Sequence, residues 1–174
     1  MLDDLFRDYA LRFQIASSAK RLDETLRLLD EMKRTLDNNP PETAEIVRRL
    51  EKIASDDGDE FASFVLVAAW SNLSCDYCPA LCRILELERC NGQHEQAVEL
   101  LAEVGDARAI PSLTKAVDYR WSYDEWLNVP RKALQALFAI GTPESLAVIR
   151  HAAGSSDDYI RGEAESLLRR GSSD

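Results

Sequence analysis

Glycine and proline are scarce in this sequence, numbering seven and six among 174 residues. Both residues interrupt helices and are frequent in sheet proteins with many tight turns, so their scarcity argues against that class. Leucine, alanine, glutamate and arginine recur throughout instead, and all four favour helices. With 45% apolar residues, the chain can also bury a continuous core. We therefore expect an all-α protein.

Histidine is also rare, with only His94 and His151 in the chain, which leaves few side chains able to exchange protons near neutral pH. The sequence lacks a Gly-x-Ser-x-Gly nucleophile motif and a glycine-rich phosphate-binding loop. These absences argue against hydrolytic and nucleotide-dependent catalysis. We expect a protein that is not an enzyme and carries no cofactor.

Long apolar runs are missing, because none reaches the roughly 18 residues that a membrane-spanning helix requires. The chain begins Met-Leu-Asp-Asp-Leu-Phe-Arg, with acids where a secretory signal peptide has bases. The four cysteines lie in helical sequence, without the regular spacings of a small disulfide-linked protein. We therefore expect a cytoplasmic protein with reduced cysteines and no membrane contact.

Basic residues are outnumbered, with 21 lysines and arginines against 31 aspartates and glutamates and a formal net charge of -10. This balance argues against the basic surface that a nucleic-acid backbone requires, so we expect no nucleic-acid partner. A basic protein would instead be attracted. A plainer interpretation, in which the acidity serves only solubility, stands beside this one.

Apolar residues recur every three or four positions in the first third of the chain, which is the spacing of amphipathic helices. Pro40 and Pro41 then interrupt the pattern, because proline lacks the amide hydrogen that a continuing helix needs. We expect residues 1–60 to form two or three antiparallel helices packed on the rest of the chain. The stripes are Leu2, Phe6, Tyr9 and Phe13, and Leu22, Leu26, Leu29, Met32 and Leu36.

From about residue 61 the sequence repeats itself. When Ala97 is placed on Ala133, each unit reads as a helix, a tight turn and a second helix. Periods of about 31 to 36 residues are typical of stacked helical hairpins. The paired positions are Leu101 with Leu137, Val104 with Ile140, Gly105 with Gly141, Ile110 with Leu146, and Leu113 with Ile149.

The turn inside each unit has its own signature. Gly105 and Gly141 lie where a helix ends in a residue with positive φ, which glycine adopts readily. Asp106 and Thr142 follow and offer side-chain oxygens that cap the next helix. Pro143 then suits a first helical turn.

The segments "EVGDARAIPSLTKAV" and "NVPRKALQALFAIGTPESLAVI" resemble the HEAT-like repeats of the phycobilisome-lyase type. The likeness covers about residues 61–170, well in two units and loosely in two others. It implies a short α-solenoid of about four HEAT-like helical hairpins in residues 61–174, with residues 1–60 as an N-terminal helical capping section. Members of this group scaffold protein complexes, and some relatives are enzymes.

Cysteine and histidine are zinc ligands, so Cys75, Cys78, Cys82 and His94 form a candidate metal site. Cys78 and Cys82, however, lie one helical turn apart on the stripe that should face the core, which favours buried apolar cysteines. Cys90 follows about 12 Å further along a helix at 1.5 Å per residue, too far to complete the site. The metal site is the weaker alternative.

His94 and Glu95 form a single His-Glu pair, whereas helical-repeat hydroxylases bind two irons through several such pairs. No second pair occurs, because His151 is followed by Ala152. We expect His94 and Glu95 on the surface in the first turn of a helix, where glutamate is favourable. A bilin-handling role, which the resemblance also implies, needs a large apolar pocket that no sequence feature defines.

Two of the three tryptophans lie in residues 118–130, "DYRWSYDEWLNVP". The interval from Ala97 to Ala133 is about five residues longer than that from Ala133 to Ala164, so the repeat carries an insert at residues 118–128. Insertions in a solenoid project from one edge.

Ser122–Glu125 matches a capping box, which predicts one helical turn inside the insert. Asn128 is the expected cap of the helix that follows. Tryptophan and tyrosine dominate binding hot spots, and neighbouring acids favour a basic partner. In the alternative, Trp121 and Trp126 fold back and cover the adjacent repeat. The predicted partner-binding residues are Tyr119, Trp121, Tyr123, Asp124, Glu125 and Trp126.

These patterns predict a non-catalytic protein-binding module of a bacterial cytoplasm, an adaptor or inhibitor that is a monomer or weak dimer. It would bind another protein through the concave face of the solenoid and the insert, and a basic partner is the one that the charge of the chain favours. An immunity protein that neutralises a bacterial toxin is one specific version. A metal-dependent or bilin-handling enzyme on the same scaffold is the alternative.

Overall fold

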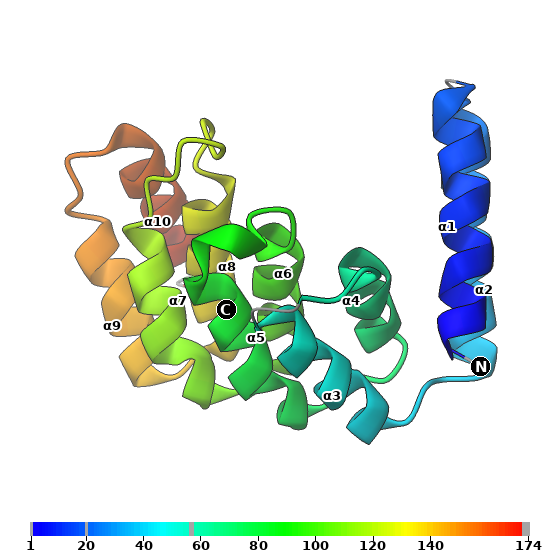
Figure 1. Ribbon diagram of the computed structural model, residues 1–174. Coiled ribbons are helices and arrows are strands. Elements are labelled where there is room, and N and C mark those ends of the chain that lie inside the picture. Colours follow the sequence, from blue (N-terminus) through cyan, green and yellow to red (C-terminus); the bar gives the residue numbers. More distant parts are fainter. Residues whose placement is uncertain (1, 20, 56–57, 172–174) are drawn as a thin grey trace.

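The computed structural model describes residues 2–19, 21–55 and 58–171, and this part of the chain contains helices and no β-strand (Figure 1). The predicted all-α class is confirmed. No helix in these ranges is both long enough and apolar enough to cross a membrane. The helices are α1 (Leu2–Ser18), α2 (Leu22–Asn38), α3 (Thr43–Ile53), α4 (Ala62–Trp70), α5 (Cys78–Glu86), α6 (His94–Val104), α7 (Ile110–Val117), α8 (Asn128–Ile140), α9 (Pro143–Ala152) and α10 (Asp158–Gly171).

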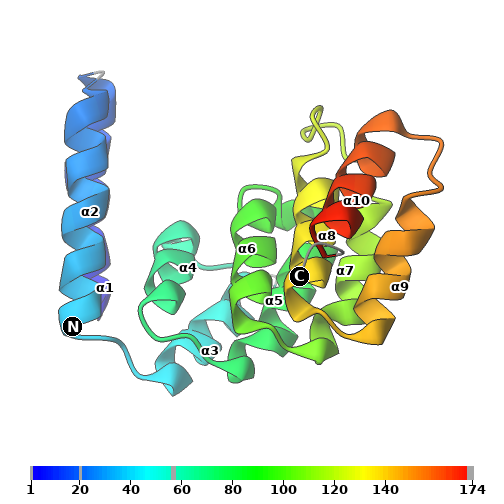
Figure 2. The ribbon, with the colours of Figure 1, turned by 180° about the vertical axis from the view of Figure 1, so that it is seen from behind.

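From α3 onward the helices stack in two layers (Figures 1 and 2). One layer contains α3, α5, α7 and α9, and the other contains α4, α6, α8 and α10. Each helix of the first layer forms a hairpin with the next helix along the chain, which lies in the second layer. The predicted short α-solenoid of helical hairpins is confirmed.

The predicted turn chemistry is confirmed in both well-matched repeats. α6 ends at Gly105 with φ of 65°, and α8 ends at Gly141 with φ of 67°. The Asp106 carboxylate then accepts a hydrogen bond from the backbone N–H two residues later at 2.8 Å. The Thr142 hydroxyl accepts one from the N–H three residues later at 3.2 Å. Both caps satisfy backbone donors that a helix start leaves unpaired.

The core lies between the two layers and is built from the aligned positions of the repeats. Ala97 and Ala133 are both fully buried, as are Leu101 and Leu137 one turn further along. The small alanines permit close approach of α6 and α8, while the leucines fill the space between the layers. Ala164 on α10 is buried in the same way, so the third unit continues the pattern.

The helices α1 and α2 form a separate hairpin at the end of the stack, beside α4 (Figure 2). The Phe6 ring of α1 lies 5.9 Å from the ring of Phe61 and 5.8 Å from that of Phe64, so the hairpin covers the end of the core. The helix α3 instead lies in the layer of α5, α7 and α9. By its contacts α3 therefore joins the stack, although the sequence groups it with residues 1–60.

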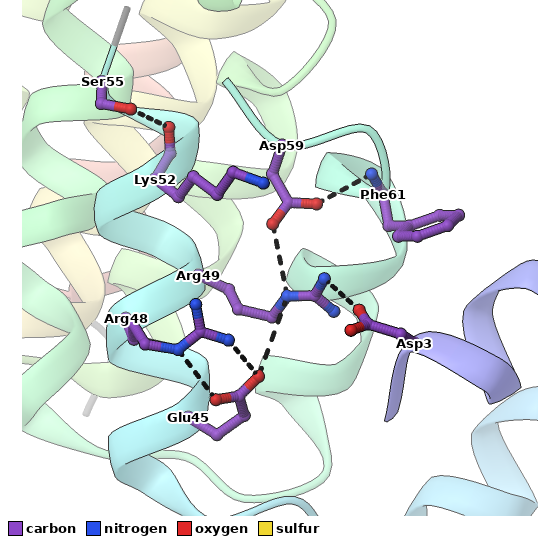
Figure 3. Close-up of polar contacts among 8 residues, drawn as sticks. All are labelled: Asp3, Glu45, Arg48, Arg49, Lys52, Ser55, Asp59 and Phe61. Carbon is purple, nitrogen blue, oxygen red and sulfur yellow. Dashed lines mark hydrogen bonds and ion pairs between the residues drawn. The ribbon is translucent and has the colours of Figure 1, made fainter. Parts of the chain in front are cut away.

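A buried arginine connects this hairpin to the stack (Figure 3). Arg49 of α3, with 6% of its side chain exposed, forms ion pairs with Asp3 at 2.5 Å and Asp59 at 3.3 Å. Its guanidinium also lies over the rings of Phe6 and Phe61. The Asp59 side chain is fully buried, so Arg49 supplies the cation that this carboxylate needs inside the junction.

Candidate functional site

Residues 118–127 connect α7 to α8 through two successive turns. The N–H of Asp124 donates to the carbonyl of Trp121 at 3.0 Å, and the N–H of Leu127 donates to the carbonyl of Asp124 at 3.1 Å. The helical turn predicted from Ser122–Glu125 is therefore wrong. Leu127 adopts a left-handed backbone with φ of 53°, which stops the turns from running on as a helix.

Asp124 caps helix α8. Its two carboxylate oxygens accept hydrogen bonds from the N–H of Asn128 at 2.7 Å and of Val129 at 2.9 Å. The prediction that Asn128 caps this helix is wrong, because Asn128 is its first helical residue and donates its side-chain amide to Glu95 instead. Asp124 was predicted as a partner contact, but the structure buries it inside the insert.

Three of the four aromatic residues of the insert, Tyr119, Trp121 and Tyr123, form a stack against α6. The Trp121 ring lies 4.2 Å from the His94 ring at an interplanar angle of 25°, and Tyr119 lies 4.2 Å from Trp121 on the insert itself. Tyr123 stacks on Trp121 at 5.6 Å. Trp121 is half-buried, so it follows the alternative in which the aromatics cover the adjacent repeat.

His94 is the residue of α6 on which the Trp121 ring stacks. The structure buries it completely, so the predicted surface position is wrong for His94, whereas Glu95 is exposed as expected. The Nε2–H of His94 donates to the carbonyl of Leu87 at 2.9 Å, and the Nδ1 of His94 accepts a hydrogen bond from the Tyr123 hydroxyl. Burial lowers the pKa of His94 below its ordinary value, so the neutral imidazole is the form that fits these two hydrogen bonds.

One side of the insert remains exposed. Trp126 is 68% exposed and Tyr123 is 40% exposed, and Glu125 lies beside them at the surface. Of the two tryptophans, therefore, Trp121 packs on α6 and Trp126 remains exposed. The exposed half of the predicted set, formed by Tyr123, Glu125 and Trp126, is the candidate binding surface.

Two of the site residues carry structural roles that the sequence analysis missed. Asp124 lies four residues before the start of α8, and an aspartate just before a helix is a signal for a cap. His94 gives no such signal, because its partner Tyr123 lies 29 residues away in a loop with no helical or strand period.

The cysteines do not come together as a metal site. No group of three or more histidine, cysteine, aspartate or glutamate side chains is arranged to hold a metal ion in the part of the chain that the structure describes. Cys78 and Cys82 lie with their Sγ atoms 3.9 Å apart on α5, while Cys75 is exposed. Cys90 is buried, which raises the pKa of its thiol.

Residues 78–169 match the family model of HEAT repeats. No curated protein and no solved structure matches the chain. The matched segment begins with α5 and ends within α10, and it contains both glycine turns and the insert. The phycobilisome-lyase subtype stays a prediction. Because the match covers more than half of the chain, the protein belongs to the HEAT repeat family.

Proposed function

We propose that this protein is a non-catalytic binding module that captures another protein through the exposed face of the insert, formed by Tyr123, Glu125 and Trp126. HEAT repeats generally mediate protein–protein interactions and usually serve as non-catalytic scaffolds. The observation that carries the proposal is the exposure of Trp126, 68%, on a segment that the Asp124 cap holds in place. A large exposed aromatic on a fixed loop suits a binding hot spot, because little ordering is needed on association.

The charge of the chain indicates the kind of partner. With a net charge of -10 and Glu125 beside Trp126, the surface attracts a partner that has lysine or arginine around an apolar pocket. A basic toxin neutralised by an immunity protein belongs to this class, and so does the basic client of a cytoplasmic adaptor. Complementary charge would raise the association rate at low salt more than the affinity.

The test is affinity capture from the source cell with three immobilised baits: wild type, Trp126→Ala and Leu11→Ala. Leu11 is a matched control, because it is 59% exposed but lies on α1. We expect one stoichiometric basic protein on the wild-type and Leu11→Ala baits. Trp126→Ala should weaken its binding by about 2 kcal/mol, or about 30-fold, with an unchanged melting temperature.

A captured partner that binds Trp126→Ala as tightly as wild type would contradict the use of the insert. Trp121→Ala separates packing from binding, because Trp121 stacks on His94 at 4.2 Å. Its loss should lower the melting temperature, whereas the loss of Trp126 should not.

A further inference from the structure

Helix α2 carries a heptad pattern of leucines, of which Leu22 and Leu26 in its first turns are exposed. The pair Leu-Asp occurs three times at intervals of seven residues, beginning at Leu22, Leu29 and Leu36. Leu26 lies one helical turn after Leu22. Residues four and seven apart share one face of a helix. The contacts with α1 lie elsewhere, for example where Tyr9 meets Glu31 and Thr35. We call Leu22, Leu26, Leu29 and Leu36 the leucine face, of which Leu22 and Leu26 are exposed, Leu29 is half-buried and Leu36 is buried in the core.

The leucine face leads into a groove between α2, α4 and α6, with a volume of about 440 Å³. Its apolar lining is Leu29 and Leu36 from α2 and Val67 and Trp70 from α4, and Trp70 is 38% exposed. The first turns of α2 extend beyond α4 (Figure 2). Leu22 at the start of α2 is 70% exposed, so the leucine face runs from the groove onto an open surface.

The groove also holds an unsatisfied acceptor. Gln96 of α6 lines it, and the Oε1 atom of Gln96 is buried without a hydrogen-bond partner among the described residues. A buried amide oxygen without a partner costs free energy that a donor from a bound molecule would recover. A molecule bound in the groove would therefore gain from a hydrogen-bond donor that faces Gln96 on α6, in addition to apolar side chains.

A row of aspartates borders the leucine face. Asp23, Asp30 and Asp37 are exposed, and none of them makes an ion pair or side-chain hydrogen bond with another described residue. Lys33 lies among these residues on the groove side, and Arg27 lies near Leu22 and Asp23 at the start of α2. Glu99 on α6 adds a further acid to the lining, although it is paired with Lys132. The edge along α2 thus offers three exposed carboxylates at seven-residue spacing.

We propose that the leucine face and its groove bind an amphipathic helix of a basic partner protein. Leucines at heptad positions fit a helix with apolar residues at the same spacing, and the aspartate row fits lysine or arginine along its edge. The accessible part of the leucine face, from Leu22 to Leu29, corresponds to about 10 Å, or about two helical turns. A second copy fits less well, because its α2 would bring the same three aspartates to the same face.

This surface lies at the opposite end of the stack from α10 (Figure 1) and does not depend on the insert. The probe is a synthetic 18-residue helix, about five turns long, with leucine at the first and fourth positions of each heptad and arginine beside them. A second peptide has glutamate in place of each arginine. Fluorescence anisotropy of the labelled peptides measures both affinities at low and at physiological salt.

We expect wild type to bind the arginine peptide at least about tenfold more tightly than the glutamate peptide. Leu22→Gln/Leu26→Gln should weaken that binding at least about tenfold, whereas Leu11→Gln/Ile15→Gln should leave it unchanged. Both pairs are more than half exposed, so both variants should fold. Asp23→Asn/Asp30→Asn should weaken binding and flatten its salt dependence.

Several results would overturn the proposal. The first is equal affinity of wild type for the two peptides. The second is no binding of the arginine peptide up to about 1 mM. The third is a loss of affinity in Leu11→Gln/Ile15→Gln as large as that in Leu22→Gln/Leu26→Gln. Sedimentation provides one more, because a dimer that Leu22→Gln/Leu26→Gln dissolves would assign the leucine face to a second copy.

Discussion

His94 behaves as a structural residue because both of its ring nitrogens are engaged inside the protein. The neutral ring donates through Nε2 to Leu87 and accepts through Nδ1 from Tyr123. Burial is the main cause that lowers its pKa, and protonation would remove the acceptor that the tyrosine hydroxyl uses. The insert is therefore held to α6 by an interaction that depends on a neutral imidazole.

The pKa of His94 gives a pH prediction. An unfolded histidine takes up a proton near pH 6.5, whereas the folded His94 stays neutral to a lower pH, because burial depresses its pKa. Its contribution to stability is thus fully present above about pH 6.5 and is lost as the pH falls towards the folded pKa. Wild type should lose more stability than His94→Gln between about pH 7.5 and 5.5.

Urea denaturation at the two pH values measures this difference. His151→Gln is the matched control, because His151 is exposed on α9, and it should follow wild type. If His94→Gln loses as much stability on acidification as wild type does, the neutral-imidazole account fails.

At the scale of elements, the turns that join the helices depend on glycine only where φ is positive. Gly105 has φ of 65° and no atom within 4 Å of the position that a Cβ would occupy. The cost of Gly105→Ala is therefore backbone strain alone, about 1 kcal/mol or slightly more. Gly162 lies inside α10, also with open space around it, and Gly162→Ala should stabilise by about 0.5–1 kcal/mol.

Equilibrium unfolding of Gly105→Ala and Gly162→Ala measures the change in the free energy of unfolding, which should have opposite signs in the two variants. Destabilisation by both would mean that Gly162 has a packing role, and no change at Gly105 would mean that this turn tolerates an ordinary residue.

These turns were predictable from sequence because their chemistry is local. Gly105 and Asp106 are adjacent, and the same pair of functions returns at Gly141 and Thr142. Repeat spacing also located the insert, since an unequal period shows where residues have been added. The solenoid as a whole follows from such local signals and from the periodicity of the apolar residues.

The interior of the insert was predictable only in part. The cap that Asp124 provides on α8 has a local signal, an aspartate just before a helix. His94 meets Tyr123 across a separation of 29 residues, and this contact depends on the folded path of the chain. The stripe through Leu22 and Leu26 shows a similar limit. A periodic stripe indicates an apolar face, but it does not indicate whether another helix of the same chain covers that face.

For the whole molecule, a buried cation contributes to the attachment of the N-terminal hairpin, beside the packing of Phe6 on Phe61 and Phe64. Arg49 pairs with Asp3 of α1 and with Asp59, whose side chain is fully buried (Figure 3). Arg49→Ala would leave the Asp59 carboxylate buried without a cation and should cost about 3–5 kcal/mol. The neighbouring Arg48, 62% exposed and paired with Glu45, is the matched control, and Arg48→Ala should change stability by less than about 1 kcal/mol.

Chemical denaturation with hydrogen exchange measures both the size and the position of the effect. Amides of α1 and α2 should exchange faster in Arg49→Ala, while those of α8 keep their protection relative to global unfolding. The double variant Arg49→Leu/Asp59→Asn removes both charges and should recover part of the loss. Equal destabilisation by Arg48→Ala and Arg49→Ala would contradict the role assigned to the junction.

The anchoring of the insert separates its fold from its surface chemistry. Asp124 and Trp121 fix the loop from the inside, through the cap on α8 and the stack on His94, whereas Glu125 and Trp126 make no contribution to either. Exchange of these two exposed residues therefore leaves the helices and their stacking intact. Related chains can diversify recognition at this loop without rebuilding the solenoid, and a randomised library at the same two positions would select new partners on an unchanged framework.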